Sequence, residues 1–330
     1  MAVAALAGVS QSAVSRVFTP GSSVSRKTAD KVLAAAEQLG YRPNVLARSL
    51  KSGKSRMIGL VVAYLENYFY PELVERLSVD LQKVGYHVLI FLAPVASANV
   101  DKIVQELMDY QVDGIVLASV SLSSDLAARC QETGLPVVLF NRGQDDPTLS
   151  SVTTDNYAGG KAVADYLCSL GHSRIAYVAG FAGATTQRDR EAGFRAGLAE
   201  AGQELFARAD GNFDYQAAQA AARALFATSR RPDAVFVGND HMAFAVMDVL
   251  RFELGLRIPQ DVSVAGFDDV PPAAWPAYSL TTYRQQADRM VAETVSLLMD
   301  SIDSGHADPK QVVVPGALRI RGSTRRHGEP

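Results

Sequence analysis

The chain is organised around two neighbouring stretches, AGVSQSAVSRVF (7–18) and VSRKTADKVLAAAEQLGYRPNVLARSLKSGKS (24–55). In the first stretch the Gly8-Val9-Ser10 turn separates a short alanine-rich helix from a second helix, predicted over 11–18. Two helices joined by a short turn that contains glycine form a helix-turn-helix unit, whose second helix enters the major groove of DNA. The N-terminal part is therefore predicted to bind DNA.

The polar side chains of this second helix can read bases. Gln11 and Arg16 can make bidentate hydrogen bonds to purine edges, Gln to adenine and Arg to guanine. Val14 and Val17 lie three residues apart and are predicted to face the helix packed behind. The DNA contacts predicted for this helix and the turn before it are Ser10, Gln11, Ser12, Ser15 and Arg16.

The distribution of charge supports a nucleic-acid partner. Residues 1–56 contain nine Lys or Arg against two acids, a net charge of +7, whereas the rest of the chain carries −10. The overall charge of −3 therefore combines a basic head with an acidic body. A basic segment is the electrostatic signature of phosphate binding, which favours DNA contact over a merely solvated surface.

From Met57 onward, short apolar strands alternate with amphipathic helices, the pattern of parallel sheets covered on both faces. Strands are predicted over 58–63, 87–92, 114–118, 137–140, 175–179, 234–237 and 262–266, and helices over 71–84, 99–110, 124–132, 156–170, 187–201, 215–227, 240–254 and 285–301. One small sheet cannot hold this many strand and helix units. The predicted fold class is α/β, an N-terminal all-α helix-turn-helix headpiece plus two doubly wound parallel α/β lobes.

The loops that follow these strands are rich in polar and aromatic residues. Ligands of open parallel sheets bind beyond the carboxyl ends of the strands, so these loops are where a ligand is expected. Asn141 follows the fourth strand, and Trp275 lies shortly after Asp268; both are predicted to face the ligand, although a core role for Trp275 stays open. Carboxylates, amides, arginine and aromatic rings together suit a small polyhydroxylated molecule.

The N-terminal motifs resemble those of the LacI/GalR family of bacterial transcription repressors. The family's A-G-V-S turn, V-S-R-V helix, V-S-x-x-T-x-x-K-V and Y-x-P-N-x-x-A-R-x-L patterns match residues 7–10, 14–17, 24–32 and 41–50. The resemblance continues through the body, which in this family is periplasmic-binding-protein-like: two lobes joined by three crossovers, with the ligand in the cleft between them.

The resemblance implies three parts: a helix-turn-helix DNA-binding domain over 1–42, a hinge helix and linker over 43–56, and a two-lobe effector-binding and dimerisation domain over 57–330. Lobe one is expected over about 57–154 plus 285–310, and lobe two over about 155–284 plus 311–324. The family's capping Asp of the first helix falls at Ala2. A weakly capped first helix, or a start upstream of Met1, is therefore expected.

The segment after Pro43 matches the family's hinge helix, which folds on DNA against its twin. A helix this short is marginal in water, and an apolar wedge between bases is a known minor-groove device. By resemblance Leu50 takes the wedge position and Ala47 the small-residue position; Asn44 and Arg48 complete the predicted hinge contacts. The alternative is a plain linker.

Several residues of the body match family positions that bind the effector. By resemblance these are Arg190, Asn239, Asp268 and Gln285, with Phe69 and Phe213 at common stacking positions. Structural roles are the alternative for each of them. The segment Tyr278-Ser279-Leu280-Thr281-Thr282 departs from the family's usual Pro-x-Leu-Thr-Thr, which alters the cleft rim and weakens any inference of the effector's identity.

The resemblance implies a sequence-specific transcriptional repressor that acts as a homodimer on double-stranded operator DNA with two half-sites. Its small-molecule effector is expected to be a sugar or sugar acid, with a purine-like ligand as the alternative. A cytoplasmic protein, nucleoid-associated when bound to DNA, is expected, because no apolar run reaches ~18 residues and no signal-peptide pattern is present.

Two other classes of protein remain as alternatives. A solute-binding protein of a transport system would use the same two-lobe scaffold, but the basic head argues against it. An enzyme of small-sugar metabolism would need a catalytic motif, and the chain has no Gly-x-Ser-x-Gly, His-Glu-x-x-His or Cys-x-x-Cys. The histidines show no metal-ligand spacing, so neither an enzyme nor a cofactor or metal is expected.

Overall fold

The structure is a computed structural model that describes residues 2–18, 22–42, 54–93, 100–120, 123–143, 148–305 and 308–325. The chain divides into two units, residues 1–55 and 56–330, here called the headpiece and the body. The predicted hinge contacts Asn44, Ala47, Arg48 and Leu50 lie outside the described residues.

The headpiece contains α1 (Ala2–Ala7), α2 (Gln11–Val17) and α3 (Arg26–Gln38). Gly8, with φ of 64°, makes the turn between the first two helices. The side chain of Ser10 caps α2 by accepting from Ala13 N at 3.2 Å, and Ser25 caps α3 in the same way. The buried side chains of this small core are Val3, Ala4, Ala7, Val14, Val32, Ala35 and Ala36.

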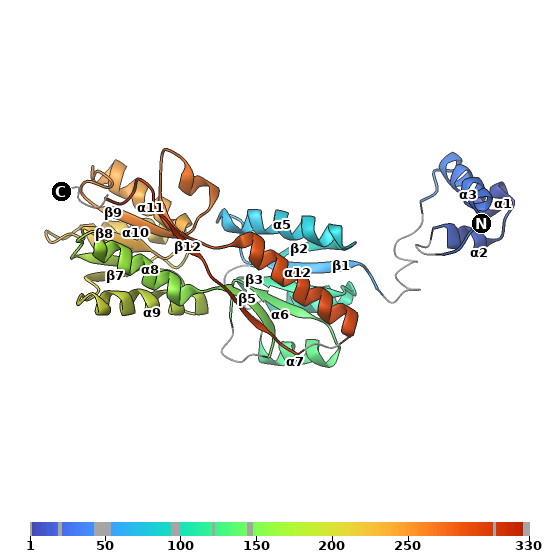
Figure 1. The fold of residues 1–330 in the computed structure, drawn as a ribbon, viewed down its shortest axis with the longest axis horizontal. Helices are drawn as coiled ribbons and strands as arrows, with labels where there is room; N and C mark the ends of the chain where they lie inside the picture. The colour runs from blue at the N-terminus through green and yellow to red at the C-terminus, as the bar shows by residue number, and fades with distance from the viewer. Residues whose placement is uncertain are drawn as a thin grey trace. The chain divides into compact units, whose positions relative to one another are not determined.

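The first lobe of the body is a six-stranded sheet in the order β11-β5-β4-β3-β1-β2, and all of its pairings are parallel. Its strands are β1 (Met57–Val62), β2 (His87–Leu92), β3 (Gly114–Ala118), β4 (Val137–Phe140), β5 (Ser150–Thr154) and β11 (Gln311–Val314). Its helices are α5 (Phe69–Lys83), α6 (Val100–Asp109), α7 (Ser124–Glu132) and α12 (Ala287–Ser304). Figure 1 shows α5 and α12 on one face of this sheet and α6 and α7 on the other.

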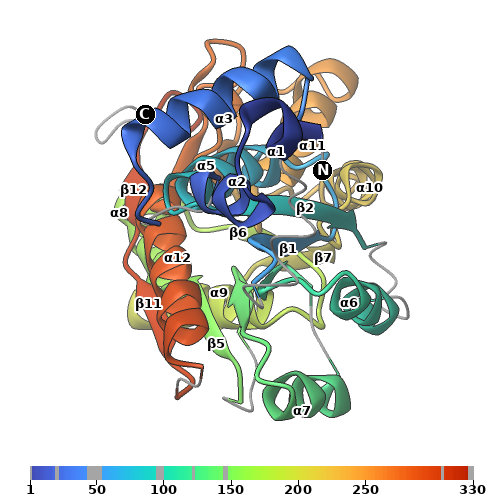
Figure 2. The same ribbon diagram turned by 90° about the vertical axis from the view of Figure 1, so that its right-hand side faces the viewer.

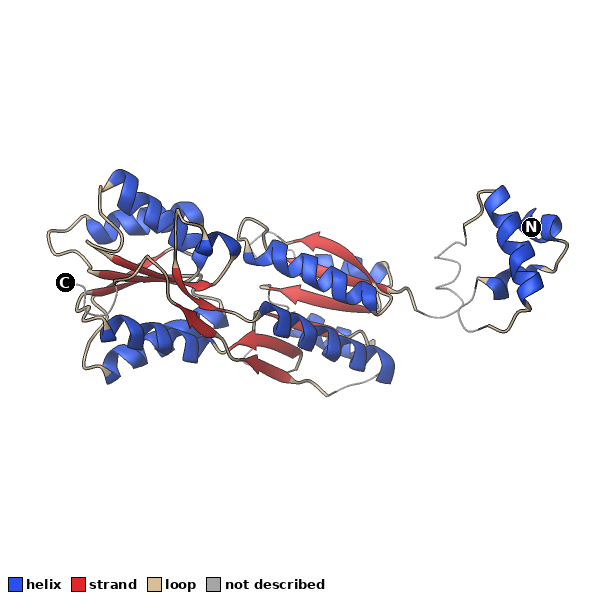
Figure 3. Ribbon diagram, turned by 45° about the horizontal axis from the view of Figure 1, so that its top comes forward, coloured by secondary structure: helices blue, strands red, loops and turns tan. Residues whose placement is uncertain are grey.

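Alternating side chains of the strands pack against the two helical layers, as the near-continuous apolar strands predicted. On β1, Leu60 and Val62 belong to the core shared with α5 and α12. Val61, between them, belongs to the core shared with α6 and α7. The sheet is therefore buried on both faces, as Figure 3 shows for each lobe.

The second lobe repeats this plan with the strand order β12-β10-β9-β8-β6-β7. Its strands are β6 (Ile175–Ala179), β7 (Ala207–Asp210), β8 (Ala234–Val237), β9 (Ser263–Asp268), β10 (Thr281–Arg284) and β12 (Ala317–Arg319), of which β12 runs antiparallel to β10. Its helices are α8 (Asn156–Ser169), α9 (Thr185–Glu200), α10 (Tyr215–Phe226) and α11 (Asp240–Asp248), with a π-helical turn over Val249–Glu253 and a 3₁₀ turn over Pro271–Ala274.

Three crossovers join the lobes: after β5, after β10 and after β11. The expectation that residues 311–324 all belong to lobe two was wrong for Gln311–Val314. This segment forms β11, which pairs in parallel with β5 of the first sheet, and Figure 2 shows α12 running beside both strands. The chain enters lobe two only after Pro315-Gly316, because three consecutive valines complete the open edge of the first sheet.

The helices of the described residues do not meet the requirements of a membrane span. None of them combines the length and the apolar character that a membrane span requires. The two cysteines are free thiols: Cys130 is buried on α7, and Cys168 is half-buried on α8.

Candidate functional site

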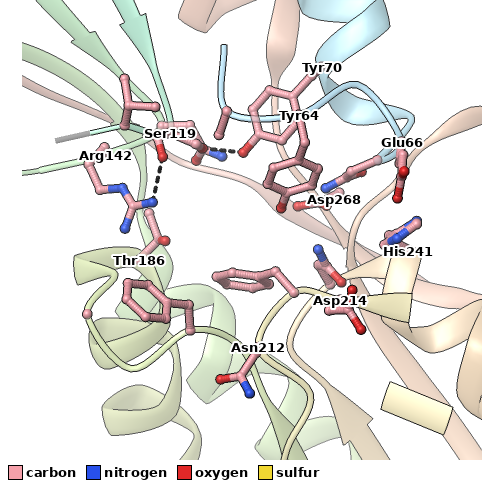
Figure 4. Close-up of a pocket in the computed structure, with 18 of the residues that line it drawn as sticks. Tyr64, Glu66, Tyr70, Ser119, Arg142, Thr186, Asn212, Asp214, His241 and Asp268 are labelled. Carbon is pink, nitrogen blue, oxygen red and sulfur yellow. Dashed lines mark hydrogen bonds between the residues drawn. The ribbon is translucent and has the colours of Figure 1, made fainter. Parts of the chain in front are cut away.

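A cavity of about 480 Å³ lies between the lobes, where loops after strands of both sheets meet. Its volume is in the range of small-molecule sites. Its lining comes from lobe one (Ala63, Tyr64, Glu66, Asn67, Tyr70, Val100, Ser119, Val120, Asn141, Arg142) and lobe two (Phe181, Gly183, Thr186, Arg190, Asn212, Phe213, Asp214, Asn239, His241, Asp268). Figure 4 shows the side chains of both lobes converging on this space.

Five of the predicted effector contacts line this cavity: Asn141, Arg190, Phe213, Asn239 and Asp268. The other three, Phe69, Gln285 and Trp275, do not. The direction in which each of these side chains points explains the difference.

Phe69 is buried in the core of lobe one. Asn67 Oδ1 accepts from Phe69 N at 3.1 Å, which starts α5 so that the Phe69 ring packs on Phe140, with centroids 6.3 Å apart. Tyr70, the next residue, faces the cavity instead. The expectation that Phe69 stacks on the ligand was therefore wrong.

Trp275 follows the 3₁₀ turn and is half exposed, with its ring 6.5 Å from that of Tyr68. At this exposure the expected core role was wrong; Trp275 does not line the cavity, and its contact with the ligand stays a prediction. Because Tyr68 lies in lobe one, this ring contact joins the rims of the two lobes.

Gln285 lies behind the cavity wall. Its Nε2 donates to Asp268 Oδ1 at 2.6 Å, and its Oε1 accepts from Thr154 Oγ1 at 2.7 Å. Thr154 ends β5 in lobe one, and Gln285 begins the second crossover. Gln285 therefore links a cavity carboxylate to the connection between the lobes, although it does not line the cavity.

Close packing of α8 on α9 positions Arg190. A side chain on Gly193 would collide with Tyr157 O, and one on Gly160 would collide with Arg190 O, so only glycine permits this approach of the two backbones. Arg190 Nη2 then donates to Asn156 Oδ1 at 2.7 Å. Its guanidinium carbon lies 3.4 Å from the centroid of the Phe267 ring, a cation–π contact.

Two buried carboxylates meet beside Arg190. Burial raises the pKa of Asp268 to about 6, although Arg190 and the hydrogen bonds from Gln285 and Asn67 act in the opposite direction. Burial, followed by repulsion from Asp268, raises the pKa of Asp240 well above its ordinary value. Asp240 accepts from Thr282 Oγ1 at 2.6 Å and from Val270 N at 3.1 Å, so it is held inside the lobe wall.

We expect Asp268 to make the unliganded body more stable in mild acid than at neutral pH. Its pKa is raised in the folded state, so the stability it contributes is full below about pH 4 and is lost as pH rises to about 6; the loss is about 3 kcal/mol. Asp268→Asn keeps the acceptor for Gln285 and removes the charge. Urea unfolding should show that the free energy of unfolding of this variant exceeds that of the parent chain, by about 1 kcal/mol more at pH 7.5 than at pH 5. An equal gain at both values would contradict the shift.

Backbone strain gathers at this cavity. Ser119, Asn141, Asn212, Phe213 and Asp268 have φ between 51° and 129°, and all line it. Side-chain-bearing residues adopt such conformations at a cost, and they persist mainly at functional sites. The strain supports the cavity as the site independently of its shape.

Several lining residues are missing from the predicted effector contacts, among them Tyr64, Tyr70, Arg142, Asp214 and His241. Tyr64 stands two residues after the end of β1, so the strand-end rule could have selected it. Burial lowers the pKa of His241, which favours the neutral ring at neutral pH. The described residues contain no group of three or more His, Cys, Asp or Glu placed to hold a metal ion.

The headpiece presents one polar face of α2. Gln11, Ser12, Ser15 and Arg16 are exposed, as is the capping Ser10, whereas Val14 is buried in the core. Arg16 Nε lies 3.4 Å from Ser12 O on this face. The five DNA contacts predicted for α2 and the turn before it thus lie together on one surface.

Comparison with known proteins agrees with both units. The model for bacterial regulatory proteins of the lacI family matches residues 2–44, and that for a periplasmic binding protein-like domain matches residues 164–324. The ribose operon repressor of Escherichia coli (strain K12) is 31% identical over 324 residues, covering 97% of this chain and 98% of the relative. The chain belongs to the lacI family of bacterial regulatory proteins.

Two solved structures of this family share the fold over nearly the whole chain. A lac repressor dimer bound to operator and an anti-inducer has a TM-score of 0.87 at 27% identity, covering 98% of this chain and 97% of that one. A complex of the transcriptional regulator CelR with cellobiose has a TM-score of 0.74 at 32% identity and covers 98% of each chain. The predicted fold class and family are confirmed, and the protein is a DNA-binding transcriptional regulator with an effector-binding body. The transport alternative is not favoured.

Proposed function

We propose that this protein is a homodimeric repressor whose affinity for operator DNA is controlled by a small polar ligand held between its lobes. The observation that carries the proposal is the strained interlobe cavity in a chain that also presents a polar recognition face on α2. The similarity to a lac repressor dimer bound to operator supports the dimer and the DNA partner.

The cavity is joined to the lobe connections through hydrogen bonds. Asp268 accepts from Gln285, and Gln285 accepts from Thr154 at the first crossover. A ligand that engages Asp268 therefore acts on groups whose positions depend on the angle between the lobes. Differential binding to two lobe arrangements is what lets a ligand shift an equilibrium between them.

On the DNA side, Gln11 and Arg16 would read bases, and Ser10, Ser12 and Ser15 would contact the backbone or adjacent bases. Asn44, Ala47, Arg48 and Leu50 keep their predicted hinge roles. A regulator of this kind acts in the cytoplasm, at the nucleoid when bound to DNA.

For the ligand, Asp268, Asn239 and Arg190 offer hydrogen-bonding groups to hydroxyls, and the Phe213 ring offers an apolar face. One relative is a ribose operon repressor and one solved structure is a complex with cellobiose, which agrees with a sugar-like effector, while a purine-like ligand is the alternative. The relatives are repressors, not enzymes, and no reaction or cofactor is part of the proposal.

The DNA claim is tested by fluorescence anisotropy on a pool of near-palindromic duplexes at several salt concentrations. The expected result is selective binding to one sequence class, with an affinity that falls steeply as salt rises, because phosphate contacts release counterions. Equal affinity for the selected duplex and its scrambled version would reject sequence-specific regulation.

A further inference from the structure

One end of the cavity holds a partly buried cation that no carboxylate of the described residues neutralises. Arg142 follows β4 and donates from Nη2 to Ser119 O at 2.7 Å, while its buried Nε has no hydrogen-bond partner among the described residues. Burial lowers the pKa of Arg142, and the other groups acting on it are Tyr70 and Tyr64. Among the described residues, no Asp or Glu contributes to its environment.

An orphan acceptor stands beside this orphan donor. The side-chain Oδ1 of Asn141 is buried and has no hydrogen-bond partner in the described part of the chain. Arg142 and Asn141 both line the cavity, and Asn141 is held at φ of 52°. A buried guanidinium nitrogen and a buried amide oxygen that lack partners both cost folding free energy, and sites that bind a ligand are where such costs are retained.

The negative side chains of the cavity lie at the opposite end. Glu66 and Asp214 are the charged groups that act on His241. Figure 4 shows Glu66, Asp214, His241 and Asp268 on one side of the space and Arg142 on the other, beside Ser119 and Thr186. Among the described residues the cavity is therefore polarised along its length, with Arg142 at the Ser119 end and the carboxylates at the other.

From this arrangement we infer that the effector is an anionic polyol, whose carboxylate or phosphate group docks on Arg142 at the Ser119 end of the cavity. The inference rests on the proposed function, because it names the ligand class of the same site. A guanidinium pairs well with either anion through parallel hydrogen bonds. A hydroxyl next to the anionic group would donate to Asn141 Oδ1, and more distant hydroxyls would reach Asn239 and Asp268.

The same geometry selects against neutral sugars. A neutral sugar that fills the cavity leaves the Arg142 charge desolvated and unpaired, and a site built for a partner group rejects analogues that lack it. The acid or phosphate of a sugar should therefore bind more tightly than the parent sugar, by about 10- to 100-fold.

The test is isothermal titration calorimetry with matched probes: D-glucose, D-gluconate and D-glucose 6-phosphate, then D-ribose, D-ribonate and D-ribose 5-phosphate, with inorganic phosphate as a fragment. The proteins are the full chain, Arg142→Gln, Arg142→Lys and the control Arg289→Gln. Arg289 is an exposed arginine on α12, 3.9 Å from Glu293. Duplex binding without added sugar is measured on the same samples.

The expected result is that at least one anionic probe binds more tightly than its neutral parent. Arg142→Gln should lose about 10- to 100-fold of that affinity. Arg142→Lys should recover part of it, and Arg289→Gln should bind like the parent chain. The sugar acid and the sugar phosphate distinguish the two sources of negative charge, and Arg142-dependent binding of either supports the inference.

The inference is overturned if neutral sugars bind as tightly as their anionic forms, if Arg142→Gln leaves anion affinity unchanged, or if no anionic probe binds. These outcomes are separate from failure of the proposed function. Selective duplex binding by the full chain and by Arg142→Gln would keep the regulator proposal intact, whereas its absence from the full chain would reject that proposal whatever the calorimetry shows.

Discussion

Arg16→Ala is expected to abolish most sequence-selective DNA binding. Arg16 is exposed on the polar face of α2, and a bidentate arginine contact to guanine is worth about 1–3 kcal/mol of discrimination. A dimer loses this contact in both half-sites, so the affinity for the selected duplex should fall by roughly 30-fold to 10,000-fold. Helix α2 should persist, because alanine is the best helix former. Fluorescence anisotropy at fixed salt measures the loss.

The matched control is Lys31→Ala, which removes one exposed positive charge from α3 of the same headpiece. Loss of a nonspecific cation should weaken binding to selected and scrambled duplexes by a similar, smaller factor. If Arg16→Ala also weakened both duplexes alike, the assignment of α2 as the base-reading helix would be wrong.

Gly193→Ala is expected to destabilise the body and to impair its ligand site together. The added methyl group would collide with Tyr157 O, a backbone atom of α8 that has no rotamer with which to yield. Overpacking of this kind costs about 1–3 kcal/mol of folding free energy. Alanine stabilises a helix by ~1 kcal/mol relative to glycine, so the substitution is destabilising overall only when the two helices cannot move apart. Here both helices are buried against one sheet, so a net loss of stability is expected.

The ligand site should suffer as well, because Arg190 lies one turn before Gly193 on α9 and is held by Asn156 at the start of α8. Denaturant unfolding followed by calorimetry with the best probe measures both effects. Ala192→Ser is the control, since it adds one heavy atom at the neighbouring exposed position and should change stability by less than about 0.5 kcal/mol. Wild-type stability and probe affinity for Gly193→Ala would contradict the packing argument.

The sequence predicted the apolar strands well and the short polar strands poorly. The strand predicted over 114–118 is β3, residue for residue, because a parallel strand buried on both faces is a continuous apolar run. Strands β5 (SSVTT), β7 (ARAD) and β10 (TTYR) were not predicted, since they are short and carry polar residues. Their pairing depends on neighbouring strands that are distant in sequence, so local pattern has little information about them.

The same distinction applies to the site. The rule that ligands bind beyond the carboxyl ends of parallel strands selected the correct loops, and Asn141, Arg190 and Asp268 line the cavity. Which side chain of a loop faces inward depends on its backbone conformation, as at the start of α5, where Phe69 N donates to Asn67 Oδ1, the Phe69 ring is buried and Tyr70 is left at the cavity. Phe213 and Asp268 both have positive φ. A positive φ is readily anticipated from sequence only at glycine, so these two backbone conformations could not be predicted.

Coupling between the cavity and the DNA is tested most directly by measuring operator affinity with and without the tightest-binding sugar probe, at equal ionic strength. The affinity for the selected duplex should change by several-fold or more, and the affinity for the probe should change by the same factor when the duplex is present, because linkage is reciprocal. If the probe binds the cavity and the duplex affinity stays the same, the protein is not regulated through this site.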